Sequence, residues 1–144
     1  MSETESLLKN PHSVSVSVII PSLSSKLFRS FYKSFLRTCS NTNDVEIIVK
    51  VDNINDISDF YAILSESKVK YKIIIYPQYN ARYSLHHFFN DMASICSGDI
   101  IWILNDDVTI LNGDWHKELK GTRNSFKDNI YCVMVAFDNG KGTD

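Results

Sequence analysis

Short hydrophobic runs alternate with amphipathic segments along most of this 144-residue chain. The runs are rich in β-branched residues and end in polar or proline-containing clusters, which is typical of strands in a buried sheet. They predict strands over 14–20, 45–51, 69–76, 100–104 and 130–137. Between the first four runs, apolar residues recur every three or four positions, which predicts helices with one buried face. These helices are predicted over 27–38, 57–64 and 85–95, with a shorter one after Asp114.

Strands and helices in this alternating order predict an α/β fold, a three-layer α/β/α sandwich with a mostly parallel, Rossmann-like central sheet. We expect one domain over 13–137, preceded by a polar tail over 1–12 and followed by a flexible Gly- and Asp-rich tail over 138–144. Pro21 is expected to end the first strand, and Gly98 to close the helix over 85–95.

Composition narrows the class of protein. Hydrophobic residues make up 44% of the chain and charged residues 22%, with a formal net charge of −2 and a pI of about 6.1. Lysine and arginine are scattered, so we expect no nucleic-acid partner. No apolar run approaches the length of a membrane span and the N-terminus lacks a secretory signal, so we expect no transmembrane segment. Three well-separated cysteines favour a reducing, cytoplasmic location.

Polar clusters follow three of the predicted strands, over 21–24, 52–56 and 105–107. The carboxyl ends of parallel strands meet at one edge of a sheet, which is where such sheets bind ligands. We therefore expect these three clusters to converge on a single binding site.

The strongest chemical signal is Asn105-Asp106-Asp107, directly after the apolar strand over 100–104, which we expect to be fully buried. Two adjacent carboxylates repel each other, and apolar surroundings disfavour both charges, so a cation would relieve the strain. Mg²⁺ is commonly bound by one or two carboxylates together with substrate phosphates. An Asx-type turn with both side chains in water is the alternative, and the residues alone leave both open.

Two other residues carry weaker signals. Asp52 could accept a hydrogen bond from a base or a ribose, or could be an ordinary turn residue. Arg82, expected in a loop after the third strand, has the forked donors that suit phosphate, but a surface arginine is equally consistent with the sequence. The chain has no G-x-G-x-x-G, no G-x-x-x-x-G-K-[ST] and no G-x-S-x-G, which disfavours dinucleotide-binding Rossmann domains, P-loop proteins and α/β-hydrolases.

Several motifs match a known family in order and spacing. The segment 16–22, which ends in Val-Ile-Ile-Pro-Ser, looks like its opening strand, and 45–53 looks like its second strand, Glu-Ile-Ile-Val-Val-Asp-Asp. Asn90 and Gly98-Asp99 keep its Asn…Gly-Asp spacing, and 104–107 looks like the Leu-Asn-x-Asp form of its D-x-D motif, with Trp115 a few residues on. Over 14–119 the chain resembles the nucleotide-binding N-terminal half of GT-A fold glycosyltransferases, specifically the family 2-like enzymes.

The resemblance implies a site and a function. The implied nucleotide-binding residues are Pro21, Ser22, Asp52, Asn53, Arg82 and Asp106, and the implied metal ligand is Asp107. Asp52 would bind the base and Asp106 would lie near the ribose. Asp107 would hold Mn²⁺ or Mg²⁺ on the diphosphate. The implied activity is glycosyl transfer from a nucleotide-diphospho-sugar donor to an unknown glycan, lipid or protein acceptor.

The chain also departs from the family pattern. Asn105 stands at the first aspartate of D-x-D, and Asn53 at the second aspartate after the second strand. The family's acceptor-binding half and catalytic base lie beyond the metal motif, over a stretch longer than the roughly thirty residues after Gly113. The chain would then be a fragment of a longer enzyme or a truncated, non-catalytic nucleotide-sugar-binding module. No catalytic residue is assigned, and Asp138 is not favoured as the base.

Two further classes of protein are less favoured. A nucleotidyltransferase would need a Gly-rich, basic loop in place of 23–26, and a receiver domain would need acidic residues in place of Pro21-Ser22.

Overall fold

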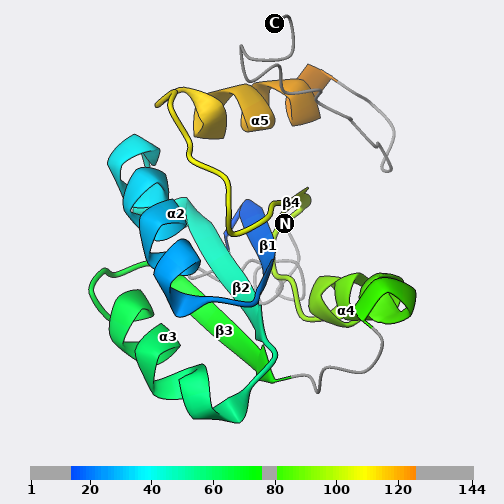
Figure 1. The fold of residues 1–144 in the computed structure, drawn as a ribbon. Helices are drawn as coiled ribbons and strands as arrows, with labels where there is room; N and C mark the ends of the chain where they lie inside the picture. Colours follow the sequence, from blue (N-terminus) through cyan, green and yellow to red (C-terminus); the bar gives the residue numbers. More distant parts are fainter. Residues whose placement is uncertain (1–13, 76–80, 126–144) are drawn as a thin grey trace, which may run out of the picture.

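Parallel strands form the centre of the molecule, with helices packed on both faces (Figure 1). The computed structural model describes residues 14–75 and 81–125, with backbone only for 81–86. In that part of the chain the strands lie in the order β3-β2-β1-β4, and all neighbouring pairs are parallel. Their bounds are β1 Val16–Ser22, β2 Val45–Val51, β3 Lys70–Ile75 and β4 Ile100–Ile103. The predicted α/β architecture is confirmed. The predicted strand over 130–137 and Cys132 lie outside the described residues.

Four helices and two short 3₁₀ turns are described around this sheet. The helices are α2 Ser25–Thr38, α3 Ile57–Leu64, α4 Ala81–Ser94 and α5 Trp115–Ser125. The turns are η1 Thr42–Asp44 and η2 Ile54–Asp56. Helices α2 and α3 cover one face and α4 covers the other, which gives the three layers predicted from the sequence (Figure 1). None of the described helices is long and apolar enough to cross a membrane.

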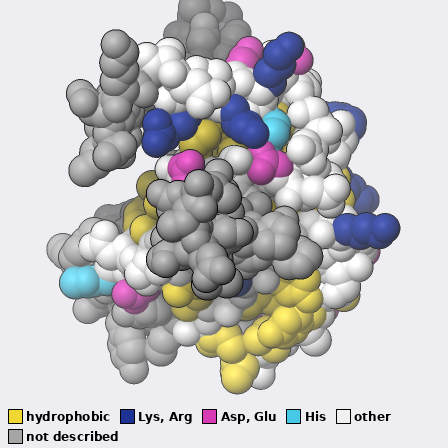
Figure 2. Space-filling model, turned by 180° about the vertical axis from the view of Figure 1, so that it is seen from behind, with side chains coloured by type: hydrophobic (Ala, Val, Ile, Leu, Met, Phe, Trp, Pro, Cys, Tyr) yellow, Lys and Arg dark blue, Asp and Glu magenta, His cyan; other side chains and the backbone are white. Residues whose placement is uncertain are grey.

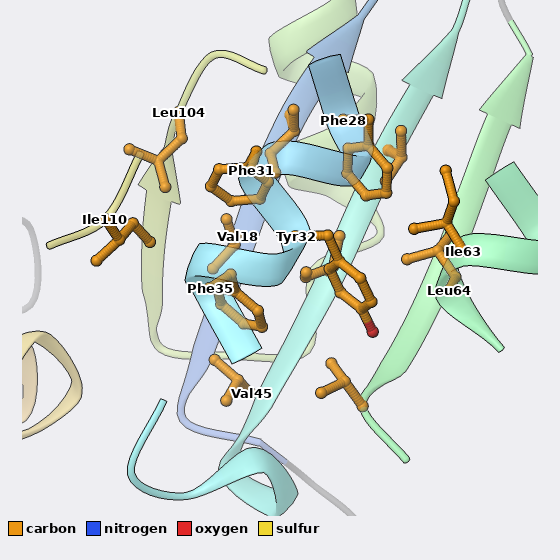
Figure 3. Packing of buried hydrophobic residues seen from close by; sticks show 14 of the residues in the cluster. Val18, Phe28, Phe31, Tyr32, Phe35, Val45, Ile63, Leu64, Leu104 and Ile110 are labelled. Atoms are coloured by element: carbon orange, nitrogen blue, oxygen red, sulfur yellow. The ribbon is translucent and has the colours of Figure 1, made fainter. Parts of the chain in front are cut away.

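The main core lies between the sheet and helices α2 and α3 (Figure 3). Side chains alternate between the two faces of a strand, so every second residue of β1 and β2 points into this core. Rings from α2 fill it: Phe28 stacks against Tyr32, and Phe35 packs against Trp115 at the start of α5. Burying such a ring stabilises the fold by roughly 1.5–3 kcal/mol. The apolar face predicted for 27–38 is therefore the face that joins α2 to the sheet.

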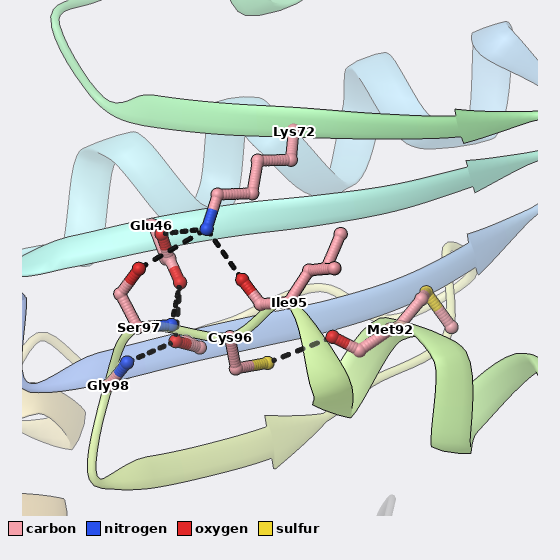
Figure 4. A network of polar contacts seen from close by, with 8 residues as sticks. Glu46, Lys72, Met92, Ile95, Cys96, Ser97 and Gly98 are labelled. Carbon is pink, nitrogen blue, oxygen red and sulfur yellow. Dashed lines mark hydrogen bonds and ion pairs between the residues drawn. The ribbon is translucent and has the colours of Figure 1, made fainter.

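The opposite face carries a smaller core made of Ile19, Ile48, Phe88 and Met92. It also carries a polar network around Glu46, which lies buried on β2 (Figure 4). The Glu46 carboxylate accepts hydrogen bonds from the Ser17 hydroxyl at 2.7 Å and from the Ser97 N–H at 2.6 Å. Its other oxygen lies 3.4 Å from the ammonium of Lys72 on β3. This network ties three strands to the segment that follows α4.

Strand β4 is less buried than its sequence predicts, which corrects the expected fully buried strand over 100–104. Ile101 is 42% exposed and Ile103 is 52% exposed, whereas Leu104 is buried. Within the described sheet, β4 pairs only with β1, and the small core under α4 contains residues of β1 and β2 but none of β4. An all-apolar run alone does not reveal which strand lies at an edge. Figure 2 shows hydrophobic side chains gathered on part of the exposed surface.

Two predicted ends of elements, the strand end at Pro21 and the helix end at Gly98, differ in the structure. Strand β1 continues through Pro21 to Ser22. The last residue of β4, Ile103, pairs in register with Ile19 of β1. Just beyond β4, the Leu104 N–H donates a hydrogen bond to the Ile19 carbonyl. Pro21 lies further along the same edge, past the end of β4, so its missing N–H removes no bond to that strand.

Gly98 does not close the helix, because α4 ends at Ser94. It instead passes close to β1: a Cβ at this position would lie 2.8 Å from the Ser15 carbonyl oxygen and 2.9 Å from the Ser17 nitrogen. The absence of a side chain allows this approach.

Candidate functional site

A pocket of about 240 Å³ lies at the carboxyl edge of the sheet, where β1, β2 and β4 end. It is lined by Pro21, Ser22, Leu23, Lys50, Asp52, Phe88, Asn105, Asp106 and Asp107. Residues from all three polar clusters therefore meet in one place, as the parallel topology predicted. Five of the predicted site residues, Pro21, Ser22, Asp52, Asp106 and Asp107, line this pocket, whereas Asn53 is not among its lining residues.

One wall of the pocket is built by Asp106. Its Oδ2 atom accepts a hydrogen bond from the Ser22 hydroxyl at 2.7 Å and one from the Leu23 N–H at 3.3 Å. Ser22 is buried and ends β1, whereas Asp106 follows β4. Hydrogen bonds to a charged acceptor are stronger than those between neutral groups. Asp106 thus fixes the β1–α2 connection beside the pocket.

Asp107 is exposed and lines the pocket from the loop after β4. Within the described residues, no hydrogen bond or ion pair engages its carboxylate. The same residues contain no group of three His, Cys, Asp or Glu side chains that could hold a metal ion by themselves. A single carboxylate fits Mg²⁺ or Mn²⁺ where substrate phosphates and water supply the other ligands. Asp107 therefore suits a metal that arrives with a phosphorylated ligand.

The opposite wall holds a buried charged pair. The Lys50 ammonium contacts Oδ1 of Asp52, with only 5% and 8% of the two side chains exposed. The ammonium also lies 3.8 Å from the centroid of the Phe88 ring, a cation–π contact. Lys50 and Asp52 are two residues apart in the chain, so they point to the same face of the sheet, the face that α4 covers.

Lys50 and Phe88 line the pocket but were not predicted as site residues. A signal for Lys50 was present in the sequence: a charged side chain inside an otherwise apolar strand must find a partner, because burying an unpaired charge is costly. Phe88 carried no comparable signal, since an aromatic residue on the apolar face of a helix is usually part of a core.

Asn53 lies outside the pocket lining, and Arg82 lies in a different element from the one predicted. The Asn53 side chain accepts a hydrogen bond from the Asn55 N–H at 2.9 Å and so caps the turn η2. Arg82 lies in the first turn of α4, not in the expected loop. The segment 81–94 contains neither glycine nor proline, and alanine and arginine are good helix formers, so the helix begins four residues before the predicted start at residue 85.

Comparison with known proteins adds the fold family. No protein-family model and no curated protein matches the sequence. Solved structures match the fold: TarS 1–349 from S. aureus superposes with a TM-score of 0.64 at 15% identity, over 78% of this chain and 33% of that one. The same protein in complex with UDP-GlcNAc gives a TM-score of 0.60 at 16% identity, over 78% of this chain and 32% of that one.

A third structure is the mannosyltransferase PcManGT from Pyrobaculum calidifontis in complex with GDP-Man and Mn²⁺, with a TM-score of 0.58 at 16% identity over 76% of this chain and 34% of PcManGT. The chain has a GT-A-like glycosyltransferase fold. It spans about a third of the length of each of these three solved chains.

Proposed function

We propose that this GT-A-like domain binds a nucleotide-diphospho-sugar donor, with a divalent metal ion, for glycosyl transfer. The observation that carries the proposal is the convergence of Asp52, Asp106 and Asp107 on one pocket at the carboxyl edge of a sheet with this fold. Two structural neighbours were solved with donors of this class, UDP-GlcNAc and GDP-Man.

The two ends of the pocket suit two ends of such a donor. Asp52 follows β2 and Asp107 follows β4, with β1 between them, so their strands are two interstrand spacings or about 9–10 Å apart. In the proposal Asp52 accepts a hydrogen bond from the nucleoside, and Pro21 and Ser22 line the middle of the pocket. Asp106 lies near the ribose, while it also holds the β1–α2 connection through Ser22.

Asp107 holds the metal in this proposal, Mn²⁺ or Mg²⁺, at the diphosphate end. When bound, such an ion offsets the negative charge that develops on the departing nucleoside diphosphate. Asp107 fits this role because it is exposed at the pocket and has no protein partner among the described residues. Asn53 and Arg82 also belong to the proposed nucleotide site, with Arg82 serving the phosphates from the first turn of α4. The acceptor is a glycan, a lipid or a protein.

Binding of donors tests the proposal directly. UDP, GDP, UDP-GlcNAc and GDP-Man would each be added with Mn²⁺ and with EDTA, and thermal unfolding followed by calorimetric titration would be measured. A ligand at a hundred times its Kd adds about 2.7 kcal/mol of stability, enough to raise the Tm of a domain this size by several degrees. We expect at least one nucleotide to do so only with the metal. If none changes the Tm at millimolar concentration, the proposal is wrong.

Donor hydrolysis and transfer assays then separate catalysis from binding alone. Metal-dependent binding without release of the nucleoside diphosphate would identify a binding module.

A further inference from the structure

Lys50 occupies an unusual position for a charged residue, because β2 is buried along its whole length. An ammonium group in such a place is tolerated only when it is paired, and pairs of this kind are rarely a large net source of stability. Its two neighbours, the Asp52 carboxylate and the Phe88 ring, both line the candidate pocket. Both printed contacts of the lysine therefore belong to the pocket, which points to a role for Lys50 there.

The pairing with Lys50 leaves the Asp52 carboxylate without a full set of hydrogen-bond partners. Its Oδ1 is paired with the Lys50 ammonium, whereas no described residue engages its Oδ2. Oδ2 is buried and accepts no hydrogen bond from any described residue. Buried polar atoms are nearly always satisfied, so an unsatisfied one calls for an explanation such as a ligand.

A second lysine–carboxylate pair on the same face of the sheet provides the contrast (Figure 4). The Glu46 carboxylate, near Lys72, also accepts hydrogen bonds from the Ser17 hydroxyl and the Ser97 N–H. That pair is satisfied within the protein and lies toward the amino end of the strands, away from the pocket. Only the pair at the pocket keeps unused acceptor capacity, which is expected if it serves a ligand.

We infer that Lys50 is a positioning residue of the donor site. Its ammonium, held over Phe88, balances the charge of Asp52 and fixes the orientation of the carboxylate, so that the free oxygen faces an N–H or O–H donor of the nucleoside. This inference rests on the proposed function. It goes beyond that function by assigning to Lys50 the nucleoside end of the ligand and no part in binding the diphosphate or the metal.

The test uses Lys50→Met, Asp52→Asn and the double variant, each titrated with UDP, GDP and inorganic pyrophosphate in the presence of Mn²⁺. Lys50→Met should weaken binding of the preferred nucleotide by about tenfold, a typical effect of losing one charged contact. It should leave the affinity for pyrophosphate, which has no nucleoside, unchanged. In the Asp52→Asn background the same substitution should have less than a twofold effect, because the carboxylate it serves is gone.

Matched measurements distinguish the outcomes. Lys72→Met removes the other ammonium and should not alter nucleotide affinity. If Lys50→Met or Asp52→Asn alone does not fold, the double variant still tests the site because it buries no unpaired charge. It should lose affinity for the nucleotide and keep its affinity for pyrophosphate. Equal losses in both backgrounds, or an equal loss for pyrophosphate, would overturn the role of Lys50 while leaving the donor site intact. If wild type binds none of the three probes, the proposed function itself fails.

Discussion

The hydroxyl of Ser22 donates a 2.7 Å hydrogen bond to the carboxylate of Asp106, a residue 84 positions later in the chain. The bond joins the end of β1 to the loop that follows β4, and the Leu23 N–H adds a second bond to the same oxygen. Asp106 therefore shapes the pocket as well as lining it. Substituting Asp106 would disturb both roles at once. The Ser22 hydroxyl is therefore the better group to remove, because this breaks the bond and leaves the carboxylate in place.

Ser22→Ala should lower the free energy of unfolding by about 1–2 kcal/mol, because it removes a buried donor to a charged acceptor. It should also weaken nucleotide binding, since the β1–α2 connection loses its tie to Asp106. Ser24→Ala is the matched control: the Ser24 hydroxyl caps α2 by accepting from the Leu27 N–H at 3.3 Å. Its loss should cost about 1 kcal/mol without changing affinity. Urea denaturation and titration calorimetry measure both quantities, and an unaltered affinity in Ser22→Ala would argue against this coupling.

Asp107→Ala should abolish the part of nucleotide binding that depends on Mn²⁺, while the fold stays intact because the side chain is exposed. Affinity in the presence of Mn²⁺ should fall at least tenfold, or about 1.4 kcal/mol, to the level that wild type shows with EDTA. Asp114→Ala removes another exposed carboxylate outside the pocket and should leave binding unchanged. Should Asp107→Ala bind in a Mn²⁺-dependent way like wild type, Asp107 is not the metal ligand.

The strands, and the convergence of the site residues at the carboxyl edge of the sheet, could be predicted because both follow from local sequence patterns. The bounds of β2 agree with the predicted run 45–51, in which every residue except Glu46 and Lys50 is β-branched and so favours a strand. The parallel order of the strands then places Pro21, Asp52 and Asp107 at one edge, whatever the details of the loops.

The remaining features depend on which segments become neighbours in space. The exposure of Ile103 follows from the place of β4 beside β1 at an edge of the described sheet, which its own sequence does not encode. The contact of Lys50 with Phe88 joins a strand to a helix 38 positions later, and no local periodicity specifies that meeting. Gly98 likewise looks like a helix stop in sequence, whereas its close approach to β1 is a tertiary contact.

Gly98→Ala should destabilise the domain by about 1–3 kcal/mol, because its Cβ would overlap backbone atoms of Ser15 and Ser17 that cannot rotate away. Gly121 provides an internal contrast within α5, where an added Cβ has nothing within 4 Å. Gly121→Ala should therefore stabilise by about 0.5–1 kcal/mol, the usual gain from replacing glycine inside a helix. Thermal and urea unfolding of the two variants measure the difference. A Gly98→Ala variant as stable as wild type would contradict the close approach.

Asp44 lies at the edge of the sheet opposite the pocket and joins β1 to α5. Its Oδ1 accepts from the N–H and the hydroxyl of Ser15, and its Oδ2 lies 2.8 Å from Nε2 of His116 and 3.2 Å from the Lys120 ammonium. Burial favours the neutral carboxyl group, but the hydrogen bonds from Ser15, His116 and Lys120 outweigh it and hold the pKa of Asp44 below its usual value.

A folded-state pKa below the unfolded value makes the ionised carboxylate stabilising, and that stability is lost as the pH falls through the folded pKa. The contribution of Asp44 should be fully present above the unfolded aspartate pKa of about 3.9 and should disappear below it. Asp44→Asn should therefore flatten the fall in stability in this acidic range relative to wild type. Urea unfolding followed by tryptophan fluorescence from about pH 5 downward measures both slopes. The assignment is wrong if Asp44→Asn loses stability with acid as steeply as wild type.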